Sequence, residues 1–521
     1  MSTPQSIICV CNFLGLTNDY RHTIYFNSLA EQRSYFSTRV AKTFTDYTYL
    51  RKNWSIKVVA KYETAESWSY LYFRNKDDGK YYYYFITEVK YLSDETVELV
   101  LEMDVMQTYM FDYNLSPCFV DREHSVTDYL WDNTIDEGLE LGNYVNNSVV
   151  EDENLKNNNM VLILSGVDLK SGTFDTLTSG VVLGNVYSGL KVYAVHLTSI
   201  EKLIYDLGAK IDGIVSMWTF PEKLIGYKST DTSPFEVTGG RSYEFTVNRP
   251  TVLDGYIPKN NKLYAYPYSY LYVSNNLGSS AIYRWERFLD GANKFEVEGA
   301  PLPDGGAKLV PKNYNGSGYN HEEGLVLTGF PTVPFNADTY KIWLAQNQNQ
   351  RTLTNITSVG SQAIGLGMVA AGLATMNPML AMGGGGMILS GSTNIASQIA
   401  QQKDMEKYPP QSRGSLSATI NSVIDQFTFS YYTKSITAER AKIIDEYFTM
   451  YGYKTQRVKV PNRNVRKKFT YTKTVGCHIT GNLCASDIVK IQSIYDNGIT
   501  FWSKQSTVGD YTGDNGILGE G

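Results

Sequence analysis

The longest stretch without ionisable side chains limits what this chain can become more than any other feature of its sequence. Residues 352–402 form a run of 51 positions without Asp, Glu, Lys, Arg or His. At the 19% charged residues of the whole chain, about ten would be expected in a run of this length. Such a segment belongs either inside a protein core or in an apolar environment such as lipid.

The centre of this run, residues 363–389, consists of two apolar arms around a broken tip. Each arm would extend roughly 20 Å as a helix, which is less than the hydrocarbon thickness of about 30 Å. Pro378 and the four glycines at 383–386 would also leave backbone N–H and C=O groups without hydrogen-bond partners, which lipid cannot provide. A single-pass anchor is therefore disfavoured. A buried core hairpin is the alternative, but a core helix normally has a polar face, and this tract has almost no polar residues. We therefore predict a membrane-active loop, whose inserting residues are Ile364, Leu366, Met368, Val369, Leu373, Met376, Asn377, Pro378, Met379, Leu380, Met382, Gly383, Gly384, Gly385, Gly386, Met387, Ile388 and Leu389.

Exposure of this loop to water would be costly. Its twelve Ile, Leu, Met and Val side chains would cost on the order of 18 kcal/mol at roughly 1.5 kcal/mol each. A soluble monomer that displayed the loop would aggregate. We expect the loop to be hidden until it is needed, within its own chain or against copies of itself in an oligomer.

The remainder of the chain has the composition of a multi-domain, mainly β protein. Tyrosine alone occurs 41 times, and aromatic residues suit pleated surfaces. Alternating patterns predict strands at 68–73, 81–86 and 96–102, and we interpret the four tyrosines at 81–84 as sheet packing. Helices are predicted at 199–207 and 436–451. The expected segments are an N-terminal β-rich tube domain (1–150), a β-rich middle region (151–350), the hydrophobic loop (351–403) and a C-terminal α+β segment that completes the tube (404–521).

The charge balance argues against tight binding of nucleic acid by the chain as a whole. The formal net charge is −6 and the sequence pI is about 5.6. One basic stretch, residues 454–473, nevertheless contains eight Lys or Arg and no acid. It has the appearance of a nucleic-acid patch, but a solvated hairpin or a contact to an acidic neighbouring subunit fits the acidic remainder better.

No catalytic or metal site is predicted. Asp121, Glu123 and His124 form the most catalytic-looking cluster, but nothing separates the environments of the two carboxylates into acid and base. The five cysteines form neither a disulfide framework nor a zinc spacing, so we expect buried structural thiols, no cofactor and no metal. The N-terminus lacks the basic region and the long apolar run of a cleaved signal peptide.

Short sequence motifs spread over nearly the whole chain resemble those of one protein family. They are NDYRHT at 18–23 with YF at 25–26, Asp104 with QTY at 107–109, FVDREH at 119–124, NTI at 133–135 with EGL at 137–139, NKLY at 261–264 with YPY at 266–268, PTVPF at 331–335 with DTYK at 338–341, IDEYF at 444–448 with YGY at 451–453, PN at 461–462 with Arg466, FTY at 469–471 with KT at 473–474, and NGIT at 497–500 with Trp502. In order and spacing they are similar to the distal tail knob proteins of small short-tailed phages of Gram-positive hosts, the Picovirinae-type phages with protein-primed genomes.

The resemblance implies a virion protein at the distal tip of the tail, with no enzymatic activity. It implies a homohexameric β cylinder that contacts other tail proteins such as the lower collar and tail tube. The lumen would pass the viral DNA without sequence-specific binding. The hydrophobic loops would plug the distal mouth and later enter the host cytoplasmic membrane as a pore. The alternative is an adhesin-like, receptor-binding tail protein that recognises the host cell wall with exposed Tyr and Trp, and in which the apolar segment is a buried core element.

Overall fold

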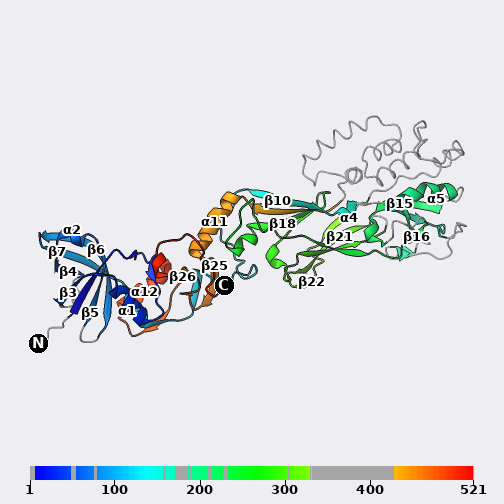
Figure 1. Cartoon of the computed structure of the whole chain (residues 1–521). Coiled ribbons are helices and arrows are strands. Elements are labelled where there is room, and N and C mark those ends of the chain that lie inside the picture. The colour runs from blue at the N-terminus through cyan, green and yellow to red at the C-terminus, as the bar shows by residue number, and fades with distance from the viewer. Residues whose placement is uncertain are drawn as a thin grey trace. The chain divides into compact units, whose positions relative to one another are not determined.

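The computed structural model describes residues 6–47, 54–75, 79–156, 160–170, 182–183, 186–187, 190–207, 213–226, 233–302, 305–328, 330 and 428–519. These residues are mainly β, as the sequence predicted (Figure 1). They divide into two compact units: unit 1 combines Met1–Leu141, Pro258–Leu263 and Glu439–Gly521, and unit 2 combines Gly142–Ile257 and Tyr264–Ala438. The units do not follow the four expected segments, because both ends of the chain share unit 1. The expected loop at 351–403 lies outside the described residues.

Unit 1 contains a six-stranded antiparallel sheet of order β3-β1-β5-β6-β7-β4. Its strands are β1 (Ser6–Asn12), β3 (Val40–Tyr47), β4 (Ser55–Val59), β5 (Trp68–Asn75), β6 (Tyr81–Ser93) and β7 (Thr96–Met103). The helices of this part are α1 (Leu29–Ser37), α2 (Tyr62–Ala65) and α3 (Val105–Tyr109). The three strands predicted between residues 68 and 102 are thus confirmed as β5, β6 and β7.

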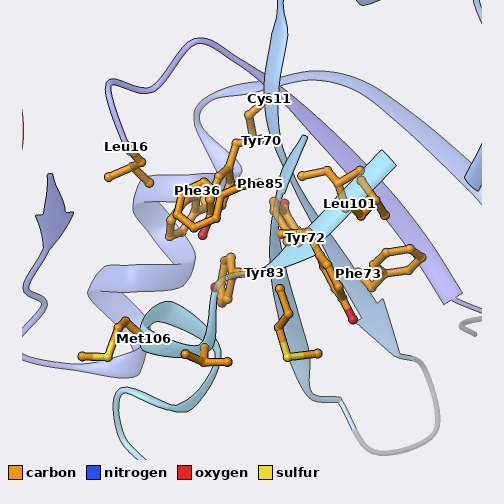
Figure 2. Packing of buried hydrophobic residues seen from close by; sticks show 14 of the residues in the cluster. Cys11, Leu16, Phe36, Tyr70, Tyr72, Phe73, Tyr83, Phe85, Leu101 and Met106 are labelled. Atoms are coloured by element: carbon orange, nitrogen blue, oxygen red, sulfur yellow. The ribbon is translucent and has the colours of Figure 1, made fainter. Parts of the chain in front are cut away.

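Aromatic side chains dominate the core between this sheet and α1, as Figure 2 shows. Phe36 of α1 packs against Tyr83 with ring centroids 4.6 Å apart, and it stacks on Tyr70 at 5.4 Å. Tyr84 is buried as well and packs edge-on against Phe73 at 5.4 Å. Neighbouring tyrosines of one strand point to opposite faces. The interpretation of the tyrosine run as sheet packing is therefore confirmed.

A second sheet of unit 1 joins the two ends of the chain. Its order is β2-β28-β26-β9-β25, and β9 pairs on both sides with strands from the C-terminal part. The strands are β2 (Thr23–Ile24), β9 (Cys118–Glu123), β25 (Tyr453–Lys459), β26 (Phe469–Val475) and β28 (Ile499–Trp502); β8 (Tyr113–Leu115) pairs with β27 (Ile479–Gly481) nearby. The accompanying helices are α11 (Ala438–Tyr451), α12 (Ala485–Asn497) and the 3-10 helix η8 (Gln505–Thr507).

Helix α11 confirms the helix predicted at 436–451, and Gly452 ends it. Gly452 has φ of +65°, and a Cβ atom at this position would lie 2.1 Å from the carbonyl oxygen of Glu123. Both the left-handed backbone and the close approach to β9 require glycine here.

Unit 2 is built from three larger sheets. Their orders are β10-β24-β18-β19, β15-β11-β14-β16 and β17-β20-β21-β22, with β23 also paired to β21. The strands are β10 (Tyr144–Glu151), β11 (Met160–Ser165), β12 (Val182–Leu183), β13 (Val186–Tyr187), β14 (Lys191–His196), β15 (Ile214–Phe220), β16 (Phe235–Glu236), β17 (Ser242–Thr246), β18 (Ser269–Ser274), β19 (Ser280–Tyr283), β20 (Lys294–Gly299), β21 (Gly306–Tyr314), β22 (Ser317–Tyr319), β23 (Leu325–Thr328) and β24 (Ser430–Ile436). Its short helices are α4 (Glu153–Lys156), η1 (Leu197–Ser199), α5 (Ile200–Leu207), η3 (Glu222–Leu224) and η5 (Trp285–Arg287), while η4 (Asn261–Tyr264) lies mostly in unit 1. The helix predicted at 199–207 is confirmed as α5.

The cysteines follow the expectation of buried thiols with one exception. Cys9, Cys11, Cys118 and Cys477 are buried, while Cys484 is exposed. The prediction was wrong for Cys484 because this residue is the N-cap of α12, at the surface end of a helix whose buried side begins further along.

Candidate functional site

The residues predicted to enter the membrane, between Ile364 and Leu389, lie within 331–427, outside the described residues. The residues that border this stretch are described, and all of them belong to unit 2. We call Leu325–Thr328 with Phe330 the upstream root, and residues 428–436 the downstream root. Together they define how the body of the protein holds the apolar segment.

The upstream root is a strand end that packs into the core. Strand β23 pairs antiparallel with β21, and its Leu325 and Leu327 are buried while the alternate side chains are exposed. Phe330 is 6% exposed, and its ring lies 4.8 Å from the ring of Phe220. The last described residue before the apolar segment is therefore held by aromatic packing.

The downstream root is buried from its first described residue. Thr428 and Phe429 are fully buried, and the Thr428 hydroxyl donates to the carbonyl of Asp152 at 2.8 Å. The backbone N–H of Asp152 donates in turn to the carbonyl of Phe429 at 3.1 Å. Strand β24 then continues between β10 and β18 in the centre of its sheet.

Burial also affects the protonation of Asp152, which contacts the downstream root. It raises the pKa of the Asp152 carboxyl above its ordinary value, against the lowering effect of a 2.6 Å hydrogen bond donated by the Tyr243 hydroxyl. Asp152 thus presents a hydrogen-bonded carboxyl inside the fold, and its backbone braces the point at which the chain returns from the apolar segment.

Two consecutive asparagines hold both roots, and we call Asn275 and Asn276 the asparagine turn. The Asn275 amide donates to the carbonyl of Val326 in the upstream root at 2.9 Å. The Asn276 amide donates to the carbonyl of Thr428 at 3.0 Å and to the hydroxyl of Ser430 at 2.9 Å. Described residues on both sides of the stretch 331–427 are therefore held by the one loop that joins β18 to β19.

The local sequence explains why this turn is rigid. Asn276 has φ of +56°, a left-handed conformation that asparagine adopts more readily than most residues. The side-chain oxygen of Asn275 accepts from the N–H groups of Leu277 and Ser279, each at 2.9 Å. Sequence reasoning missed this site, because no local pattern reveals that a turn will contact residues about 50 and 150 positions away.

Half of the eight basic side chains in the stretch are paired with carboxylates of their own unit. Four of its lysines form ion pairs: Lys459 with Glu123 at 2.5 Å, Lys467 with Asp514 at 3.3 Å, Lys468 with Asp510 at 2.9 Å and Lys473 with Asp121 at 3.6 Å. Arg463 lies over the rings of Tyr25 and Tyr113. Paired charges of this kind make few contacts available to phosphates.

The cluster of Asp121, Glu123 and His124 has structural contacts instead of catalytic ones. Glu123 is buried between Lys459 and the backbone N–H of Asn462, which donates at 3.0 Å. The His124 Nδ1 accepts from the N–H of Tyr471 at 2.8 Å, so Nε2 carries the proton and donates to the Thr449 carbonyl at 3.0 Å. Burial lowers the pKa of His124 to about 3, so the ring is neutral.

A buried ionic cluster that the sequence did not predict fastens Pro258–Leu263 to unit 1. The Glu137 carboxylate contacts the guanidinium of Arg122 and the ammonium of Lys262, and it accepts from the backbone N–H of Lys454 at 2.9 Å. Asn260 adds hydrogen bonds from its amide to Asp445 at 2.7 Å and to Thr449 at 2.9 Å. Such a network is costly to break on one side, because a buried charge would then remain unpaired.

Among the described residues, none of the helices is both long enough and apolar enough to cross a bilayer.

Comparison with known proteins identifies the family. The chain is 26% identical to tail knob protein gp9 of Bacillus phage PZA and 25% identical to that of Bacillus phage B103, and each match covers 96% of this chain and 96% or 97% of the relative. The fold is similar to the tail knob protein gp12 of bacteriophage C1, with a TM-score of 0.68 at 14% identity over 98% of this chain and all of that one. Residues 5–114 match the family of caudoviral major tail protein N-termini. Residues 233–516, more than half of the chain, match the C-terminal domain of tail knob protein gp9 of Bacillus phage phi29, and this protein therefore belongs to the phage tail knob family, as a structural component of the virion tail.

Proposed function

We propose that this protein assembles as a hexamer into a tube at the distal tip of the tail, and that the genome leaves the virion through its lumen. In this proposal the apolar loops of the subunits plug the distal mouth before infection. They later insert into the host cytoplasmic membrane and form a pore through which the DNA passes. Other tail proteins hold the tube on the particle.

The observation that carries this proposal is a charge-free segment within a stretch that is bordered on both sides by residues bound to the asparagine turn. The run at 352–402 has no ionisable residue, and both roots of the segment are hydrogen-bonded to the asparagine turn. A segment held in this way can change its environment while the β body keeps its fold. Without a charge, it enters lipid without the cost of about 2.5 to 3.5 kcal/mol for each charged residue at the bilayer centre.

The charge distribution supports a lumen that releases its cargo. A conduit that neutralised many phosphates would bind DNA and slow its exit. The chain is acidic overall, and lysines of the basic stretch are paired within unit 1. We accordingly propose that the basic stretch faces neighbouring subunits or the outside, and a particle image with this stretch at the narrowest part of the channel would contradict the proposal.

Liposome leakage tests the membrane step. The assembled protein, under conditions that release the loop, should permeabilise dye-loaded vesicles. Leu373→Asp combined with Leu380→Asp should abolish leakage and leave the assembly intact. The matched control is Leu289→Asp with Ile257→Asp, two exposed apolar residues of unit 2, which should leak like the parent. Equal leakage from the loop variant and the parent would exclude pore formation by this segment.

A second function, recognition of the cell wall, is favoured by one exposed aromatic pair. Tyr129 and Trp131 are 55% and 53% exposed, and their rings stack at 5.1 Å with an interplanar angle of 5°. Large, rigid aromatic surfaces with polar tips are suited to contact with a ligand. Binding of purified wall saccharides by a variant without residues 352–402, lost again in Tyr129→Ala with Trp131→Ala, would assign the protein to this function.

A further inference from the structure

Unit 1 contains a cavity of about 380 Å³ whose wall includes two cationic side chains, Arg466 and Lys259. His124 and the loop of Gly513–Gly516 complete much of the wall, and this loop brings one carboxylate, that of Asp514, to the cavity as well. A cavity of this size exceeds what a single water or ion fills and lies within the range of small-molecule sites. All residues that line the cavity belong to unit 1, whereas the upstream and downstream roots belong to unit 2.

Arg466 is buried, and part of its guanidinium lacks a hydrogen-bond partner. The residue is 6% exposed, and its Nε atom has no hydrogen-bond acceptor. In the described part of unit 1, no carboxylate lies within ion-pair distance of its guanidinium. The backbone of Arg466 is fixed, because its N–H donates to the Thr470 hydroxyl at 3.2 Å and its carbonyl accepts from Ser503 at 3.4 Å. The side chain is therefore held at the cavity by a rigid main chain.

The acids nearest to Arg466 are committed to other groups. Asp128 accepts from the Tyr453 hydroxyl at 2.6 Å and from the backbone N–H of Asn261 at 3.0 Å. Asp514 accepts from the Gly516 N–H at 2.8 Å and pairs with Lys467 at 3.3 Å. The ring of His124 offers no acceptor either, because Nδ1 already accepts a hydrogen bond and Nε2 donates one.

Lys259 adds a second positive charge to the wall. Its backbone N–H is bound to Asp445 at 2.7 Å, which fixes the start of the side chain. The side chain is exposed, and among the described residues its ammonium forms no ion pair. Buried charges in folded proteins are normally paired, and an unpaired guanidinium beside a cavity is satisfied most directly by an anion within that cavity.

We propose that this cavity binds the phosphate group of a small ligand. The buried guanidinium of Arg466 would donate hydrogen bonds to the phosphate, and the ammonium of Lys259 would supply the second positive charge. Phosphate fits better than a carboxylate, because its three oxygens can accept from a guanidinium and an ammonium at the same time. The volume that remains beyond one phosphate accommodates the group to which the phosphate is attached.

Calorimetric titration of the full-length protein with inorganic phosphate at constant ionic strength tests this site. The parent should bind, Arg466→Met should bind at least tenfold more weakly, and the matched control Arg457→Met should bind like the parent. Arg457 belongs to the same basic stretch but lies exposed on β25. Absence of binding by the parent, or equal binding by the parent and Arg466→Met, would overturn the proposal.

Thermal unfolding provides a second readout in case Arg466→Met does not fold. Phosphate should raise the Tm of the parent and of Arg457→Met. It should raise the Tm of Lys259→Met much less, because this variant lacks one of the two cations that bind the phosphate. Lys259 is exposed, so its replacement leaves the core intact. An identical rise in the parent and in Lys259→Met would count against the site. Glycerol phosphate distinguishes a phosphate ester from free inorganic phosphate as the natural ligand. Tighter binding of glycerol phosphate than of inorganic phosphate indicates an ester, and weaker binding indicates free phosphate. If neither compound binds, the site is refuted.

Discussion

The hydroxyl groups of Tyr113 and Tyr495 lie 3.0 Å apart in a buried hydrogen bond, although 382 positions separate the two residues in the chain. Tyr113 opens β8, and Tyr495 belongs to α12. The bond joins the first and last parts of the sequence inside unit 1, with all of unit 2 inserted between them.

This contact predicts a measurable coupling between the two ends of the chain. Tyr113→Phe and Tyr495→Phe should each lower the free energy of unfolding by about 0.5 to 1.5 kcal/mol, because each removes the buried hydrogen bond between the two hydroxyl groups. The double variant should cost less than the sum, with a coupling of about 0.5 to 1.5 kcal/mol. Denaturant unfolding of the four proteins measures it, and strict additivity would show that the hydroxyls do not interact.

Deletion of the apolar segment should leave the body of the protein folded. We expect a variant in which a short Gly/Ser linker replaces residues 352–402 to be soluble and to assemble like the parent, because both roots are fixed by buried contacts of unit 2. Light scattering and electron microscopy measure assembly. Aggregation or unfolding of this variant would instead support the alternative of a buried core element.

Loss of the asparagine turn should loosen both roots together. Asn276→Gly keeps the left-handed backbone but removes the amide that holds Thr428 and Ser430, so we expect a loss of about 1 to 2 kcal/mol of stability and faster amide exchange around residue 428. Asn315→Gly is the control, because Asn315 also has a positive φ, of +55°, but lies exposed on another turn of unit 2. If the two substitutions lowered stability equally, the loss would come from the greater backbone freedom of glycine and not from the missing Asn276 hydrogen bonds.

His124 should make the stability of unit 1 depend on pH. The unfolded chain protonates this ring near pH 6.5, while in the folded chain burial lowers its pKa to about 3. Between these values the unfolded state binds more protons, so stability falls as the pH falls from 6.5 towards 3, by up to about 1.4 kcal/mol per pH unit.

The measurement compares His124→Gln with the parent by denaturant unfolding between pH 5 and 7. The variant should lack this part of the slope. His321→Gln, in which the replaced side chain is 53% exposed, should keep the parental slope. Parallel pH profiles for the parent and His124→Gln would contradict a neutral, buried ring.

The strands and helices that depend on a local residue pattern could be predicted from the sequence. Alternation revealed β5, β6 and β7, and helix signals with a glycine stop revealed α5 and α11, because period and capping are properties of neighbouring residues. The pairing of Lys468 with Asp510, or of Asn276 with Thr428, depends on how distant segments meet, and no single sequence encodes it visibly. The basic stretch illustrates the difference: its charges were evident, but their partners in unit 1 were not. The function of residues 364–389 stays a prediction.

The asparagine turn holds described residues on both sides of the stretch 331–427, Val326 before it and Thr428 after it. The hydrogen bonds of Asn275 to Val326 and of Asn276 to Thr428 close the stretch between these two described residues into a loop at its base. The entropic cost of closing a loop grows slowly, by about 0.6 kcal/mol for each doubling of its length. A change in the length of this loop therefore costs little in closure entropy, so the same pair of asparagines can close loops of very different lengths.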